Sequence, residues 1–66
     1  MEKLTNREIT ILKLITQGYE NSEISKTIFI SIHTVKAHIS KIIKKLHAKN
    51  RANAVYIALK NNLLDE

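Results

Sequence analysis

The chain has 66 residues and a formal net charge of +5, from eleven Lys and Arg against six Asp and Glu. It has no cysteine, which excludes disulfides and thiolate chemistry, and no apolar run near the roughly 20 residues that cross a bilayer. A chain this short forms one domain, residues 1–66, and buries only about 60% of its unfolded surface, so pairing with a second copy is expected to add stability. Since its first residues are charged and polar, unlike a signal peptide, we expect a cytoplasmic protein without a membrane partner.

The positive charge is concentrated after residue 23. Residues 1–23 carry three Lys and Arg against four Glu, whereas residues 24–64 carry eight Lys and Arg and no acidic residue. A solvated helix surface usually mixes charges of both signs, because oppositely charged side chains four residues apart attract each other. The single-sign segment therefore indicates binding to a polyanion, and the alternative is a merely soluble basic surface.

The first predicted helix spans about residues 6–17. Thr5 and Glu8 have the spacing of a capping box, in which each side chain accepts a hydrogen bond from the other residue's backbone amide. An apolar stripe follows, and Gly18 can leave the helix in the left-handed conformation without steric cost.

The second predicted helix, about 22–28, has Asn21 as its cap, and the third, about 32–46, has Ser31. Only about three residues connect the two helices. They must therefore cross steeply, as in a helix-turn-helix.

The third helix has the clearest periodicity in the chain. Its predicted buried stripe consists of Ile32, Val35, Ile39, Ile42, Ile43 and Leu46. At about 100° per residue, the opposite face centres on Ala37 and is flanked by His33, Ser40, Lys41 and Lys44, with Lys36 on one shoulder and Thr34 and Lys45 on the other. Small side chains in the middle and long lysines at the edges suit a face that enters a nucleic-acid groove, because the lysines can reach phosphates.

Asn50 is the predicted cap of a fourth helix, about 51–61, which Asn62 ends in the left-handed conformation. The small residues Ala54 and Ala58 allow close approach of the core, of a second chain or of both. The sequence thus predicts an all-α fold, a four-helix bundle with a central helix-turn-helix.

At these spacings the sequence resembles the LuxR-type (GerE-like) helix-turn-helix domain of bacterial transcription regulators, over residues 4–64. The matching residues are Leu4, Thr5, Arg7, Glu8, Leu12, Leu14, Gly18, Asn21, Glu23, Ile24, Ile30, Ser31, Thr34, Val35, Lys36, His38, Ile42, Lys45, Leu46, Asn50, Arg51, Ala54 and Val55. The resemblance implies sequence-specific binding of double-stranded DNA, with the third helix in the major groove, and a homodimer formed through the fourth helix. RNA polymerase is a further partner to consider, and such domains occur both free-standing and within larger regulators that carry a receiver or ligand-binding domain.

The residues expected to bind DNA are Ser31, His33, Thr34, Lys36, Ala37, Ser40, Lys41 and Lys44. Those expected to form the dimer are Arg51, Ala54, Val55, Ala58 and Leu59. Within the first group, a lysine can reach a phosphate or a guanine edge and an alanine can touch a thymine methyl. For Lys45, pairing with Glu8 is the alternative to a phosphate contact.

The chain departs from the family pattern at two places. His47 and Ala48 stand where the family has Gly and Val, which predicts either a strain of about 1 kcal/mol in a left-handed turn or a different turn. Ser25 stands where the family prefers Ala, and its hydroxyl is expected to bond to a carbonyl one turn back.

Other functional classes lack support in the sequence. His33 and His38 lie about 140° apart around one helix and His47 lies beyond its end, so no metal site is predicted. The chain has no nucleophile-elbow, P-loop or dinucleotide motif, so we expect neither an enzyme nor a cofactor. Two alternatives stay open: the promoter-reading end of a sigma factor, which would typically lack the fourth helix, and a basic helical module that docks acidic proteins.

Overall fold

The structure of the protein is a computed structural model that describes residues 2–65. These residues form four helices and no strand: α1 (Asn6–Thr16), α2 (Asn21–Ile28), α3 (Ile32–Lys45) and α4 (Arg51–Lys60). The predicted all-α fold is confirmed, and each helix boundary lies within one residue of its predicted place. None of the helices in this part of the chain is long and apolar enough to cross a bilayer.

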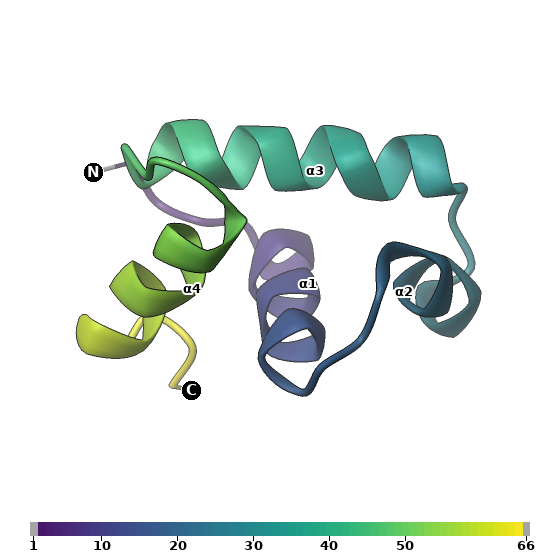
Figure 1. Cartoon of the computed structure of the whole chain (residues 1–66), viewed down its shortest axis with the longest axis horizontal. Coiled ribbons are helices and arrows are strands. Elements are labelled where there is room, and N and C mark those ends of the chain that lie inside the picture. Colours follow the sequence, from purple (N-terminus) through teal and green to yellow (C-terminus); the bar gives the residue numbers. More distant parts are fainter. Residues whose placement is uncertain (1, 66) are drawn as a thin grey trace.

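The longest helix, α3, lies across the other three helices (Figure 1). It packs against α1, α2 and α4, and α1 also packs against α4. All three neighbours lie on the same side of α3, so its opposite side faces away from the rest of the molecule (Figure 1).

The core lies between α3 and the other three helices. Its largest fully buried side chains come from α1, α2 and α3, and they are Ile11, Leu12, Ile24, Val35 and Ile42. The buried side chains of α4 are the small Ala54 and Ala58, which allow that helix to approach the core closely. The predicted stripe of α3 was wrong at its first member: Ile32 is 43% exposed, because it lies at the rim of a hollow that no helix fills.

The predicted capping box at the start of α1 is confirmed. The Thr5 amide donates to Glu8 Oε1 at 2.8 Å, and the Glu8 amide donates to Thr5 Oγ1 at 3.1 Å. Ser31 and Asn50 cap α3 and α4 as predicted, each accepting a hydrogen bond from the backbone amide three residues on.

The predicted cap of α2 was wrong. Glu20, not Asn21, is the N-cap, and its amide donates to the Glu23 carboxylate at 2.9 Å. Glu23 lies three residues after Glu20 and can reach back to its amide, so the helix begins one residue earlier than predicted. Asn21 becomes the first helical residue, and its side chain is free to bond elsewhere.

Left-handed residues end the helices. The predicted positive φ is observed at Gly18 (91°) and Asn62 (54°), and at His47 (52°) the left-handed turn is the one of the two predicted alternatives that the structure adopts. Phe29 also has a positive φ (57°), which no feature of the sequence indicated. The prediction for Ser25 was wrong: its hydroxyl donates to the carbonyl of Ile30, five residues ahead, at 2.7 Å. The turn after α2 brings that carbonyl within reach, so it replaces the carbonyl one turn back.

A buried ion pair joins α1 to the C-terminal end of α3. Lys45 Nζ lies 2.8 Å from Glu8 Oε1, and the Glu8 side chain is only 3% exposed. Lys45 also donates to the carbonyl of Lys3 at 3.3 Å. Burial raises the pKa of Glu8, but hydrogen bonds from Lys45 and Thr5 and the lysine charge together lower it below its ordinary value.

We predict that Glu8→Gln lowers the free energy of unfolding by about 1–3 kcal/mol at pH 7, because the amide oxygen is a weaker acceptor than the carboxylate and no longer neutralises the charge of Lys45. Since the pKa is lower in the folded chain, the carboxylate stabilises the fold above about pH 4.5, and this contribution is lost as the pH falls through the folded pKa. Urea unfolding from pH 7 to pH 3 measures both effects. The exposed Glu2→Gln variant is the control, and a constant penalty across this pH range would contradict the assignment.

Candidate nucleic-acid interface

All eight residues predicted to bind DNA are exposed, and seven of them lie on α3. We define the α3 face by these residues, which are Ser31, His33, Thr34, Lys36, Ala37, Ser40, Lys41 and Lys44. The buried residues of α3, Val35, Ile39 and Ile42, lie on its other side, against the core. The structure therefore brings the predicted residues together on one open surface, while their contact with DNA stays a prediction.

The N-terminal end of α3 is chemically suited to an anion. Ser31 Oγ accepts from the Thr34 amide at 3.1 Å and lies 2.9 Å from the Thr34 hydroxyl. The first turn of the helix contains no acidic residue, so the partial positive charge of its free amides is not offset locally. A phosphate beside this end would meet both hydroxyls and the helix amides.

Beside the C-terminal half of α3 lies a groove of about 480 Å³. Its basic lining comes from His38, Lys41, Lys44 and Lys45, and the chain's N-terminal segment forms the opposite wall. Two acidic residues also line the groove: Glu8 is paired with Lys45, and Glu2 is exposed in the N-terminal segment, so the lining has three lysines and two glutamates. His38 is half-buried and was missed as a member of this surface, because its position on the helical wheel lies outside the predicted face.

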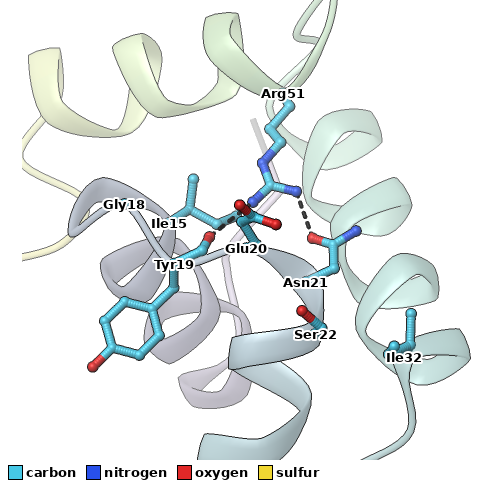
Figure 2. Close-up of a pocket in the computed structure, with 8 residues that line it drawn as sticks. All are labelled: Ile15, Gly18, Tyr19, Glu20, Asn21, Ser22, Ile32 and Arg51. Atoms are coloured by element: carbon cyan, nitrogen blue, oxygen red, sulfur yellow. Dashed lines mark hydrogen bonds between the residues drawn. The ribbon is translucent and has the colours of Figure 1, made fainter.

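The structure places Arg51 differently from the other expected dimer residues. Its guanidinium turns toward its own chain: Nη1 donates to Asn21 Oδ1 at 2.5 Å, and Nη2 donates to the carbonyl of Tyr19 at 3.3 Å. Figure 2 shows this side chain reaching from the start of α4 into a hollow of about 580 Å³ at the start of α2, with the Tyr19 ring turned away. Arg51 thus ties α4 to the helix that precedes the α3 face.

The remaining expected dimer residues divide into two groups. Ala54 and Ala58 are 2% and 0% exposed and lie in the core, so their side chains are not open to a second chain. Leu59 is exposed and Val55 half-buried. Together with Ala52 and Tyr56 they form an outward stripe at i, i+3, i+4 and i+7, which we call the α4 stripe. Tyr56 was missed, although its helical spacing from Ala52 and Leu59 places it on the same side.

No group of three His, Asp or Glu side chains within residues 2–65 is placed to hold a metal ion. The exposed His33 and the half-buried His38 lie on different sides of α3. The groups that the α3 face offers to a ligand are therefore mainly cations, hydroxyls and methyl groups.

We predict that Arg51→Lys destabilises the fold by about 1–2 kcal/mol, because an ammonium cannot reproduce the two-branched bond to Asn21 and Tyr19. In a double-mutant cycle with Asn21→Ala, the two changes should be non-additive by about 0.5–1.5 kcal/mol. Urea unfolding of the four chains measures this coupling. Strictly additive penalties would show that the Arg51 bond to Asn21 contributes nothing to the fold.

The comparisons with known proteins place the chain in a family. Residues 2–58 match the family described as "Bacterial regulatory proteins, luxR family". The response regulator protein VraR of Staphylococcus aureus is 48% identical over 63 residues, and so is that of Staphylococcus saprophyticus. These matches cover 96% of this chain but 30% of each relative, so the chain spans about a third of their length.

Solved structures agree with the sequence matches. The transcription factor GerE superposes with a TM-score of 0.89 at 35% identity, covering 96% of this chain and 94% of GerE. The response regulator ChrA of a heme-sensing two-component system also gives 0.89, at 38% identity over 96% of this chain and 31% of ChrA. VqmA of Vibrio cholera, solved as a complex with ligand and DNA, gives 0.89 at 29% identity over all of this chain and 29% of VqmA. The chain belongs to the LuxR family of bacterial regulatory proteins and has the fold of the GerE-like helix-turn-helix domain.

Proposed function

We propose that this chain binds double-stranded DNA in a sequence-specific manner to regulate transcription, with α3 in the major groove. The observation that carries the proposal is the α3 face, whose small centre and lysine edges are open to solvent within a 41-residue segment that lacks any acid. An α-helix fits the major groove, and a uniformly positive surface attracts the phosphate backbone. Membership of the LuxR family supports the same function, and this family consists of regulators, not enzymes.

The residues of the α3 face divide by the part of DNA that they suit. Lys36 and Lys41 reach outward from the edges and can bind phosphates or the acceptor atoms of guanine. Ala37 and Ser40, at the centre, allow the helix to approach base edges, where a methyl group can meet thymine and a hydroxyl can bond to several bases. Thr34, beside the Ser31 cap, is placed for a phosphate.

The α4 stripe suits a second copy of the chain. Its exposed members are Ala52, Tyr56 and Leu59, and the last two are 58% and 55% exposed. A two-fold pair joined there would present two α3 faces to successive major grooves, about 34 Å apart. This assigns Val55 and Leu59 to the dimer, whereas Ala54 and Ala58 serve the core and Arg51 bonds within its own chain.

Further partners and location follow from this function. A regulator bound beside a promoter lies within reach of RNA polymerase, which we propose as a partner of the DNA-bound pair. In bacteria such a complex forms in the cytoplasm. The sigma-factor alternative is disfavoured, because α4 is a complete helix capped by Asn50 and packed into the core through Ala54 and Ala58.

We predict that Lys36→Ala weakens binding to a duplex selected from a random pool and lowers the slope of log affinity against log salt by about one, because one phosphate contact is lost. The matched control is Lys60→Ala, since Lys60 is an exposed lysine at the end of α4, outside the α3 face. Gel-shift titrations at several salt concentrations measure both slopes. An unchanged affinity in Lys36→Ala would favour the basic protein-interaction module instead.

We predict that Leu59→Asp abolishes cooperative occupancy of a duplex with two half-sites, because a charge within the α4 stripe opposes its burial against a second copy. Affinity for a duplex with one half-site should stay within about twofold. Asn61→Asp adds the same charge at an exposed position outside the stripe and controls for repulsion from DNA. Sedimentation of the protein on both duplexes gives the stoichiometry, and equal pairing by both variants would refute the proposed dimer.

A further inference from the structure

Phe29, the residue that ends α2, is unusual in two respects. Its side chain is 92% exposed, more than any other large apolar side chain that is exposed in residues 2–65. Its backbone has a φ of 57°, in the left-handed region that bulky side chains rarely adopt. The disfavoured backbone conformation costs free energy on folding, and the exposed ring gains almost none from burial that could offset it.

The turn around Phe29 does not depend on its side chain. The amides of Phe29 and Ile30 both donate to the carbonyl of Ser25, and Ser25 Oγ donates to the carbonyl of Ile30 at 2.7 Å. These bonds fix the backbone, and a glycine or asparagine would form the same turn with less strain. The fold therefore needs the conformation at this position but not the phenyl ring.

The position of Phe29 relates it to the candidate interface. It precedes Ser31 by two residues, so their Cα atoms are at most about 7 Å apart. The connection that carries it leads directly into the N-terminal end of α3 (Figure 1). Its cationic neighbours in sequence are Lys26 and Lys36, and no acid occurs between residues 24 and 64.

We propose that Phe29 contacts DNA, with its ring packed against a deoxyribose beside the phosphate bound at the start of α3. The proposal rests on the proposed function. The DNA backbone alternates charged phosphates with sugars whose faces carry C–H groups, so an apolar ring next to phosphate-binding hydroxyls meets an apolar surface of matching size. Phe29 lies within residues 24–64, which contain eight Lys and Arg and no acidic residue, and this charge favours a polyanion over a basic partner.

The first test measures two effects of one substitution, which we expect to be opposite: higher stability and lower affinity for DNA. Phe29→Gly should raise resistance to urea, because the strain of the left-handed conformation is removed, and should lower affinity for a one-half-site duplex roughly three- to tenfold. The salt slope should stay unchanged, because an apolar contact releases no counterions. Phe29→Asn should behave in the same way, because asparagine also tolerates the left-handed conformation.

The second test observes the ring directly. The chain contains one Phe, so biosynthetic labelling with 4-fluorophenylalanine gives a single ¹⁹F resonance from residue 29. Adding the one-half-site duplex should shift that resonance, with the same midpoint as the gel-shift titration. A protein partner such as a polymerase subunit would shift it only when that protein is added.

The outcomes separate this proposal from the function on which it rests. Unchanged affinity in Phe29→Gly overturns the role of Phe29, whatever the resonance does, and the DNA-binding function still stands if Lys36→Ala lowers affinity and salt slope. Lower affinity with a smaller salt slope overturns the sugar contact, because it would report a lost phosphate contact. Lower stability in Phe29→Gly overturns the claim that the fold does not need the ring. Failure of both Phe29→Gly and Lys36→Ala to change affinity would refute DNA binding itself.

Discussion

The burial of one side of α3 against three other helices is the constraint on which the rest of this structure depends. Val35, Ile39 and Ile42 lie on that side, and their burial fixes the rotation of the helix about its axis. Because α3 cannot rotate without exposing them, the opposite face is presented at one fixed angle. A short chain thereby holds a set of polar side chains in place without a disulfide or a cluster of metal-ligating side chains in residues 2–65.

The pairing of charged side chains follows from the same packing of α3 against the other helices. Glu8 is the buried carboxylate of the described chain, and the structure pairs it with Lys45 at the end of α3. This pair joins α1 to α3 and removes one negative charge from the neighbourhood of the basic groove. Arg51 acts in a comparable way on the other side, where its guanidinium satisfies groups at the start of α2. Two cations of this basic chain thus hold helices together and leave the remaining lysines of α3 for a ligand.

The helices and most of their caps were predictable from the sequence, because they depend on residues three or four positions apart. Thr5 with Glu8 and Ser31 with Thr34 are such local pairs. The bonds of Arg51 join residues 30 or more positions apart, and they depend on how the helices cross, which periodicity does not determine. The same reason explains why alanines of α4 expected at a dimer interface lie in the core. The conformation of Phe29 escaped prediction because no local rule places a bulky residue there.

The connections between the helices contain four, three and five residues, and each includes one residue with positive φ. Such short connections have little conformational freedom, since hydrogen bonds across each turn already restrict the backbone. A partner that meets this domain encounters an almost rigid body, so association sacrifices little backbone entropy. The free energy of each contact is then retained as affinity, which allows a surface of a few small side chains and lysines to discriminate between ligands.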